Sequence, residues 1–271
     1  MGSRTVGFIG ELWKERKVLK LLVQRDLRVR YSQSFLGYLW TIIDPLANAL
    51  IYFVIFAYIF NGRDVGHNPY FLFLLAGLLP WQWFNAAVNE AMRSLVTERQ
   101  LVRSTKLPRE IWVVRVVASK GLEFLFSLPI LAAFVAGYMY LGQAQIDWEL
   151  LYWPLAIFMQ FVLITGLGLI LAPLTVLIFD IQPTVRIVLR VLFYATPILF
   201  NLDAIAKIPD GLRWIYQMNP LTGIMELYRS GLFVADVSWG IVGVSAAVTA
   251  FTFILGVFTF KKLEPAMLKE I

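Results

Sequence analysis

Long apolar runs dominate the pattern of hydrophobic and polar positions along the chain. A helix needs about 20 apolar residues to cross roughly 30 Å of hydrocarbon. Runs of that length lie at Tyr38–Phe60, Tyr70–Met92, Ile111–Leu141, Tyr152–Phe179 and Trp239–Phe260, and a shorter one at Val185–Phe200. The pattern predicts an all-α integral membrane protein with six transmembrane helices. We expect a cytoplasmic region over 1–37, a transmembrane domain over 38–260 and a cytoplasmic tail over 261–271.

The shortest run, Val185–Phe200, ends near Thr196-Pro197, and an amphipathic stretch interrupted by Pro and Gly follows it. Backbone that is not regularly helical is tolerated at membrane depth only where protein buries it or where it lines a cavity. The pattern therefore predicts short re-entrant helices between the fifth and sixth spans.

Lysine and arginine are distributed unevenly between the two sides of these runs. Most of the 24 lie before the first run, after the second, at the start of the third and fifth, or after the sixth. The loops on the other side hold only Arg63, Lys207, Arg213 and Arg229. Cytoplasmic loops carry the excess of basic residues in membrane proteins. We therefore expect both termini to be cytoplasmic.

Composition supports a membrane protein and excludes several other classes. The chain is 59% hydrophobic and 15% charged, with a mean hydropathy of +0.70, whereas soluble domains are about 25% charged. The net charge of +6 reflects topology, so we expect no nucleic-acid partner. The absence of Cys excludes thiolate metal sites, and with His67 as the single histidine we expect no metal site. No stretch resembles a cleaved signal peptide.

Motifs for nucleotide binding and catalysis are absent from the sequence. No phosphate loop of the form G-x-x-x-x-G-K-[ST] occurs, so the chain cannot bind ATP in that manner. There is no G-x-S-x-G elbow and no H-E-x-x-H helix. We expect no catalytic residues and no cofactor, and a membrane enzyme has little chemistry available.

The segment from Glu11 to Tyr31 is too charged to span a membrane but has helical periodicity. One face carries the apolar residues Leu12, Leu19, Leu22, Val23 and Leu27, and the opposite face carries Lys14, Lys17, Arg25 and Arg28. Leu21, Asp26 and Arg30 break this pattern, although Asp26 and Arg30 are spaced to pair across one turn. Such a helix should lie along the cytoplasmic headgroups, either as a simple surface anchor or as part of a docking surface for a soluble partner.

The connection between the second and third runs, Thr97–Glu110 (TERQLVRSTKLPRE), is called the basic connection below. Its residues of interest are Arg99, Leu101, Arg103, Lys106, Leu107 and Arg109. Pro108 should end any helix there. A short helix on the cytoplasmic face could fit a groove of a partner protein, although a plain positively charged loop is an equally good interpretation. Asp180, in the turn Phe179–Pro183, could touch the same partner.

Ionisable residues within the spans are functional candidates by default. Glu123 is the deepest, Asp44 and Glu90 lie in the first and second spans, and Arg186 and Arg190 stand one turn apart at the start of the fifth. They could instead pair with each other or reach the interface by snorkelling. Aromatic residues could face lipid or form the wall of a pathway for sugar rings; the candidates are Tyr52, Phe53, Phe56, Phe60, Phe193 and Tyr194.

Several stretches resemble the type-two ABC exporter permeases that move polysaccharides such as O-antigen, wall teichoic acid, capsule and galactan. The first is RDLRVRYSQSFLGYLWTIIDPL, from Arg25 to Leu46. The others are Thr196-Pro197-Ile198, Met218-Asn219-Pro220-Leu221-Thr222 and Glu226-Leu227-Tyr228-Arg229. The order of the amphipathic helix, the spans and the basic loop is also similar, and the resemblance covers nearly the whole chain.

The resemblance implies a homodimeric permease of a bacterial inner membrane that is bound to two copies of a separate ATPase subunit. ATP and Mg would be bound by that partner, and the cargo would be a lipid-linked polysaccharide. The basic connection would be the coupling helix, and the N-terminal helix an interface helix. Leu202–Met218 would form gate helices, and the candidate gate residues are Trp214, Asn219, Pro220, Glu226 and Arg229. The alternative is a gradient-driven carrier or channel that acts without an ATPase, which predicts internal repeats and paired acids at mid-bilayer.

Overall fold

The computed structural model describes residues 10, 12–32, 37–55, 68–200, 210–233 and 237–270. All regular elements in these ranges are helical, which agrees with the predicted all-α class. In chain order they are α2 (Arg16–Ser32), η1 (Gly37–Leu39), α3 (Trp40–Val54), α4 (Tyr70–Ala91), α5 (Ser94–Thr97), α6 (Arg99–Ser104), α7 (Ile111–Tyr140), η3 (Trp148–Tyr152), α8 (Trp153–Leu177), α9 (Ile181–Tyr194), α11 (Asp210–Met218), α12 (Pro220–Arg229) and α13 (Trp239–Glu270).

Four helical segments are long and apolar enough to cross a membrane: Tyr70–Ala91, Ile111–Tyr140, Trp148–Leu177 and Trp239–Glu270. They match the second, third, fourth and sixth predicted runs. The helix of the first run, α3, has 15 residues, and residues 56–60 of that run lie outside the described residues. The helix of the fifth run, α9, has 14 residues. It ends two residues before Thr196, whose place before Pro197 disfavours a helical conformation.

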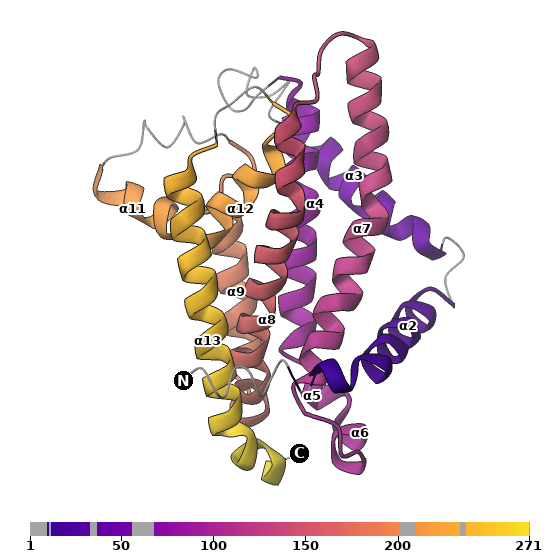
Figure 1. The fold of residues 1–271 in the computed structure, drawn as a ribbon, viewed down its shortest axis with the longest axis vertical. Helices are drawn as coiled ribbons and strands as arrows, with labels where there is room; N and C mark the ends of the chain where they lie inside the picture. The colour runs from indigo at the N-terminus through magenta and orange to yellow at the C-terminus, as the bar shows by residue number, and fades with distance from the viewer. Residues whose placement is uncertain are drawn as a thin grey trace.

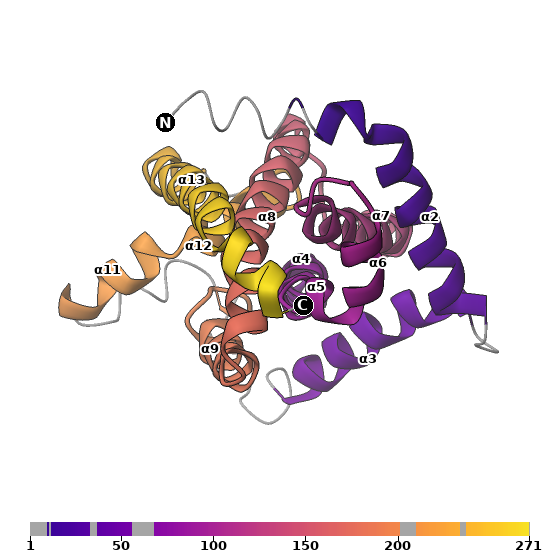
Figure 2. The same ribbon diagram turned by 90° about the horizontal axis from the view of Figure 1, so that it is seen from below.

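Helix α4 lies at the centre of the bundle, as Figure 2 shows. Within an apolar stretch of 18 residues taken from each helix, 83% of the residues of α4 are buried, against 22% in α7 and 28% in α13. Helices α3, α7, α8 and α9 all pack against it. The outer helices expose apolar side chains such as Phe158 and Phe251, as expected for surfaces that face lipid.

Glycines allow α8 and α13 to approach backbone to backbone. A Cβ added at Gly166 would lie 2.7 Å from the Cα of Phe253, and one added at Gly256 would overlap the backbone of Gly166. Small residues at such crossings give close van der Waals packing, which drives helix association within membranes. The contact between α8 and α13 is the most extensive between any two described helices.

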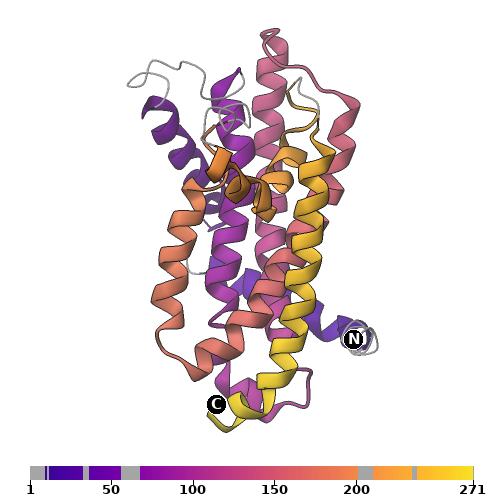
Figure 3. The ribbon, with the colours of Figure 1, turned by 90° about the vertical axis from the view of Figure 1, so that its left-hand side faces the viewer.

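The shorter helices lie toward one end of the bundle or the other (Figure 1). Helices α2, α5 and α6 lie at one end, together with the C-terminal end of α13 and the turn between α8 and α9. The short helices α11 and α12 lie in the other half (Figures 1 and 3), and α11 projects away from the bundle (Figures 1 and 2). The helix α13 continues to Glu270, so the predicted tail begins as an extension of the last span.

Candidate functional site

The basic connection contains the helix α6 and presents charge outward over a small apolar base. Val102 is fully buried, and Leu101 and Leu107 pack against the core. Arg103 and Lys106 are exposed. Arg99 is exposed too, and its Nη2 donates to the carbonyl of Glu270, 2.7 Å away. Together with Gln100 and Ser104, Arg99 and Arg103 line a shallow surface depression.

The other residues predicted at this surface lie near the same end. Arg109 donates from Nη1 to the carbonyl of Leu107, which fixes the loop around Pro108. Asp180 is exposed in the turn before α9, and its carbonyl accepts from Thr184 Oγ1 at 2.7 Å. The helix α6 ends at Ser104, before the proline that was expected to end it, so the last residues of the basic connection form a loop.

Four charged residues, called the Glu98 cluster, join the basic connection to α2 and α7. Glu98 Oε1 lies 2.5 Å from Arg25 Nη2 and 2.9 Å from Arg115 Nη1. Asp26 completes the cluster, with Oδ1 3.1 Å from Arg25 Nη2 and Oδ2 3.3 Å from Arg115 Nε. Arg115 is buried and its guanidinium also lies over the ring of Trp112. The carboxylate of Glu98, in the basic connection, is therefore ion-paired with both α2 and α7.

The ionisation of Glu98 reflects these contacts. Burial alone would raise the pKa of its carboxyl, but the hydrogen bonds and positive charges of Arg115 and Arg25 outweigh that effect. The pKa of Glu98 is consequently below its ordinary value. The carboxylate is ionised at neutral pH, as the ion pairs require.

A second set of four residues, called the Glu123 cluster, fastens the other end of α2. Arg30 lies 2.6 Å from Glu90 Oε1 and 2.6 Å from Glu123 Oε1. Lys120 Nζ lies 3.0 Å from Glu123 Oε2 and 3.5 Å from Glu90 Oε2. Partly buried carboxylates such as these need partners to offset the loss of hydration. Glu90 and Glu123 are thus ion-paired, but with Arg30 and Lys120 and not with the other ionisable residues of the spans.

The expected pairing of Asp26 with Arg30 is wrong. Asp26 pairs with Arg25 and Arg115, whereas Arg30 pairs with Glu90 and Glu123. Packing of α2 against α7 places Arg115 beside Asp26 and Glu123 beside Arg30. The expected apolar face is present, because Val23 and Leu27 are buried. Lys14, Lys17 and Arg28 are exposed, while Arg25 belongs to the Glu98 cluster.

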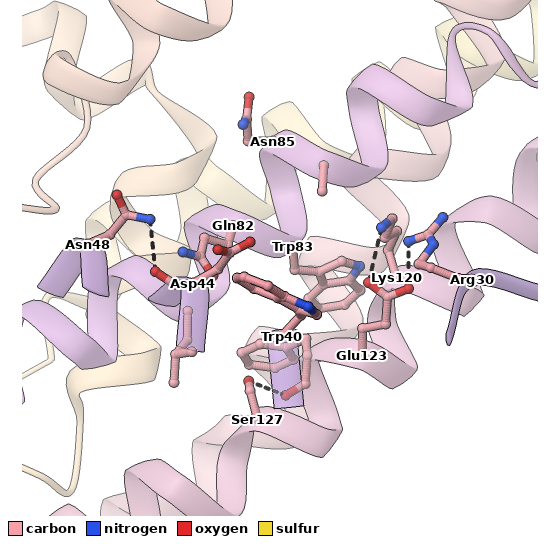
Figure 4. Close-up of a pocket in the computed structure, with 13 residues that line it drawn as sticks. Arg30, Trp40, Asp44, Asn48, Gln82, Trp83, Asn85, Lys120, Glu123 and Ser127 are labelled. Carbon is pink, nitrogen blue, oxygen red and sulfur yellow. Dashed lines mark hydrogen bonds and ion pairs between the residues drawn. The ribbon is translucent and has the colours of Figure 1, made fainter. Parts of the chain in front are cut away.

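A cavity of about 610 Å³ lies between α3, α4 and α7, beside the Glu123 cluster, and is called the α3–α7 cavity (Figure 4). Figure 4 shows Asp44, Asn48 and Gln82 grouped on one side and Arg30, Lys120 and Glu123 on the other, with Trp40 and Trp83 between them. The α3–α7 cavity is lined by Arg30, Trp40, Asp44, Asn48, Leu79, Gln82, Trp83, Asn85, Ala86, Lys120, Glu123, Phe124 and Ser127. Glu123 thus lines a cavity while remaining ion-paired.

A second cavity, of about 660 Å³, lies between α3, α4 and α9 and is called the α3–α9 cavity. Its lining comprises Asn48, Tyr52, Leu78, Trp81, Gln82, Asn85, Asn89, Arg186, Leu189, Arg190, Phe193 and Tyr194. Asn48, Gln82 and Asn85 line both cavities, so the two adjoin along α3 and α4.

Three of the six aromatic candidates meet in the α3–α9 cavity. The ring of Phe193 lies 5.7 Å from that of Tyr52, 5.3 Å from Trp81 and 5.1 Å from Tyr194. Phe53 instead packs edge-on against Phe71 at 5.6 Å. Phe56 and Phe60 lie outside the described residues.

Sequence reasoning missed the polar stripe of α4. Gln82, Asn85 and Asn89 recur at helical spacing and all line the α3–α9 cavity. Asn89 Nδ2 donates to the carbonyl of Asn85 at 2.8 Å. Three amides on one face of a largely apolar span were a readable signal, since polar residues inside a membrane usually face the protein interior.

The candidate gate residues lie around α12. Asn219 caps this helix by accepting from Leu221 N at 3.0 Å, and its Nδ2 donates to Thr196 Oγ1 at 2.9 Å. Pro220 occupies the first helical position, where its missing N–H costs nothing. These bonds tie the start of α12 to the end of α9.

The far end of α12 is held by two charged side chains. Arg229 donates to the carbonyls of Pro197 and Ile198, at 2.5 and 2.6 Å, and its guanidinium lies 3.6 Å above the ring centre of Phe73. Glu226 accepts from the backbone N–H of Ser238 at 2.6 Å. Trp214 is exposed on α11. Of the predicted gate segment Leu202–Met218, residues 202–209 lie outside the described ranges.

Comparison with known proteins identifies relatives along nearly the whole chain. The O-antigen export system permease protein RfbA of Klebsiella pneumoniae is 30% identical over 91% of this chain and 92% of its own. The protein of the same name from Myxococcus xanthus is 31% identical over 83% and 84%. The polysialic acid transport protein KpsM of Escherichia coli is 28% identical over 94% and 96%. Residues 17–233 match the family described as ABC-2 type transporter, and the chain therefore belongs to the ABC-2 transporter membrane family.

Proposed function

We propose that this chain is the membrane subunit of an ATP-driven exporter that moves a lipid-linked polysaccharide across the inner membrane of a bacterium. Its relatives are named as permeases or transport proteins for O-antigen and polysialic acid, and the match extends over most of each chain. The chain itself is a transport subunit and not an enzyme. ATP and Mg bind to a separate ATPase subunit, and no other cofactor takes part.

One observation carries the mechanism: the exposed basic connection is fastened by Glu98 to both α2 and α7. An ATPase can drive a permease only if its two states contact the permease differently. A partner that pushed on Arg103 or Lys106 would move α2 and α7 with the basic connection, because Glu98 joins these elements through ion pairs. The exposed Asp180 turn offers a second contact at the same end.

The complete transporter is a homodimer bound to two ATPase copies. Each protomer has six spans, with both termini and the basic connection in the cytoplasm. In this arrangement α2 is an interface helix along the headgroups, with Lys14, Lys17 and Arg28 toward them. The described residues at 38–260 form the permease domain.

The cargo path runs beside the α3–α9 cavity, along Tyr52, Phe193 and Tyr194, with Glu123 in the adjoining cavity. The gate helices α11, which carries Trp214, and α12, which Asn219 caps, close its outer end. The aromatic lining suits the apolar faces of sugar rings.

The proposal is tested by affinity purification and by depletion. A tagged chain purified from its own membrane should carry a subunit with a phosphate loop, and depletion should leave a lipid-linked glycan inside the cell. The proposal fails if the chain purifies without an ATPase and, alone in vesicles, moves cargo at full rate under an ion gradient. That result would establish the gradient-driven alternative.

A further inference from the structure

The carboxylate of Asp44 differs from the others that lie beside the α3–α7 cavity. In the Glu123 cluster two carboxylates and two cations pair with one another. Asp44 lines the same cavity and is exposed. It forms no ion pair with any residue that the structure describes. The charged side chains around the cavity therefore leave one negative charge without a counter-charge.

The neighbours of Asp44 supply neutral hydrogen-bonding groups and no cation. Asn48, one turn further along α3, donates from Nδ2 to the main-chain carbonyl of Asp44 at 2.9 Å, so this bond does not involve the carboxylate. Gln82 and Asn85 of α4 bring further amides to the lining, and Figure 4 shows Gln82 grouped with Asp44 and Asn48. A charged group close to a membrane interior is stabilised by an opposite charge. A cationic ligand would supply that charge.

Two tryptophan rings lie between Asp44 and the Glu123 cluster (Figure 4). Trp40 precedes Asp44 by four residues on α3, so the two side chains share one face of the helix. Trp83 is buried, its ring stacks on that of Phe124 with centroids 5.2 Å apart, and its Nε1 donates to the carbonyl of Val117 at 3.4 Å. The faces of indole rings attract cations, ammonium groups among them. A carboxylate beside these rings therefore suits an ammonium group.

The guanidinium of Arg30 offers a place for an anionic group on the opposite side of the cavity. Its ion pairs involve Nη1 and Nη2, and a guanidinium carries five N–H hydrogens, so donors remain. The Arg30 side chain is 29% exposed, against 12% for Lys120, which makes Arg30 the more accessible cation. The cavity therefore suits a ligand that carries both a cation and an anion.

The position of the cavity indicates where such a ligand comes from. Arg30 lies near the end of α2 and Trp40 begins α3, and both line the cavity, which thus extends to the junction of these two helices. Figure 2 shows α2 and α3 along the margin of the bundle. An amphipathic helix such as α2 lies among the headgroups of the membrane. A cavity at this junction is therefore in reach of lipid headgroups.

We propose that the α3–α7 cavity binds a zwitterionic phospholipid whose headgroup ends in a primary ammonium, as in phosphatidylethanolamine. The ammonium contacts the carboxylate of Asp44 and the ring of Trp40, and the phosphate contacts Arg30. The inference concerns a membrane lipid and not the cargo, and it goes beyond the proposed function. An anionic lipid without an ammonium would leave Asp44 uncompensated. A trimethylated ammonium would keep the attraction to the ring but could not donate hydrogen bonds to Asp44. The bound lipid joins α3 to the end of α2.

Binding is measured by native mass spectrometry of the purified full chain in neutral detergent. The probes are phosphatidylethanolamine, phosphatidylcholine and phosphatidylglycerol with identical acyl chains. Phosphatidylethanolamine should bind at least about tenfold more tightly than phosphatidylglycerol, since a hydrogen bond to a charged group is worth that factor or more, and phosphatidylcholine should lie between them. The variant D44N should bind phosphatidylethanolamine about as weakly as phosphatidylglycerol. The matched control D147N neutralises an exposed carboxylate outside the cavity and should bind as the unaltered chain does.

Three results would overturn the proposal. The first is unchanged binding of phosphatidylethanolamine by D44N. The second is equal affinity of the unaltered chain for phosphatidylethanolamine and phosphatidylglycerol, which would make the cavity a site for lipid of any headgroup. The third is displacement of phosphatidylethanolamine by an equal concentration of spermidine, which would make the ligand a soluble amine.

A second measurement covers the case in which D44N does not fold. A photo-crosslinking residue replaces Trp40, or Phe251, which is exposed on α13. At Trp40 it should capture radioactive phosphatidylethanolamine several-fold more than radioactive phosphatidylglycerol, and at Phe251 it should capture the two lipids equally. Equal capture of both lipids at Trp40 would contradict the proposal. Neither assay uses the ATPase or a glycan, so a negative result here leaves the co-purification and depletion tests of the proposed function intact.

Discussion

The carboxylate of Glu98 and the guanidinium of Arg115 lie 2.9 Å apart, although one belongs to the basic connection and the other to α7. The Arg115 side chain is 5% exposed and that of Glu98 is 18% exposed, so water screens the pair only weakly. Removing Glu98 would leave the buried guanidinium of Arg115 with only its longer contact to Asp26, at 3.3 Å. This pair is where force on the basic connection would reach the membrane helices.

The variant Glu98→Gln should loosen α2 from the bundle. Breaking a buried pair costs on the order of 3 kcal/mol, and Arg25 and Arg115 both lose a charged partner. Hydrogen exchange in detergent should show faster exchange of the α2 amides over Val18–Leu27, while α13 amides keep their rates. Glu15→Gln, a neutralisation just before α2, is the matched control. Unchanged α2 protection in Glu98→Gln would mean that the apolar face alone holds the helix.

Acid should release the same helix. Because the pKa of Glu98 is lowered in the folded chain, its contribution is fully present above the ordinary carboxyl pKa of 4.5 and is lost as pH falls through the depressed value. Exchange of the α2 amides, corrected for intrinsic rates, should therefore be constant near neutrality and accelerate in acid below pH 4.5. This step should be smaller in Glu98→Gln, and a step of equal size would assign it to another carboxylate.

Reversing charge on the basic connection should uncouple transport. In R103E/K106E two exposed positive residues become negative, which would repel a partner surface that fits them. Export should fall to background, while the amount of chain in the membrane stays normal. The double reversal K262E/K269E at the same end of the bundle should export normally. Normal export by R103E/K106E would remove these two residues from the coupling surface.

The bonds of Arg229 should contribute measurably to stability. Lysine at this position keeps the charge but cannot donate to the carbonyls of Pro197 and Ile198 through one planar fork. Arg229→Lys should lower the free energy of unfolding by about 1.5–3 kcal/mol, the range for a hydrogen bond to a charged group. The measurement is unfolding by SDS titration in mixed micelles. Arg93→Lys, at an exposed position, should leave the transition in place.

Features that depend on a single segment could be predicted from the sequence. The four long helices could be predicted from the length of their apolar runs, because a run of that length either crosses the membrane or is buried in the protein. The helix α2 could be predicted from the spacing of Leu19, Val23 and Leu27. The helix α9 is shorter than its apolar run because Pro197 disfavours helix at the preceding residue, a local effect that was readable at Thr196-Pro197.

The ion-pair clusters could not be predicted in the same way. Arg30 and Glu123 are 93 positions apart, and their contact depends on how α2 packs against α7. Arg30 lies one turn from Asp26 along α2, but in the folded chain Asp26 pairs with Arg115, whose side chain is less exposed than that of Arg30. The stripe of Gln82, Asn85 and Asn89 could have been predicted from its helical spacing, although its side chains carry neither a charge nor an aromatic ring.

The glycine contact between α8 and α13 has a mechanical consequence for any transport cycle. Two backbones in direct contact through Gly166 and Gly256 have no side-chain layer that could slide or rearrange between them. The helices α8 and α13 should therefore keep their relative position during each transport cycle. The helices α3 and α9, which pack against α4 but also border cavities beside it, then have more room to move.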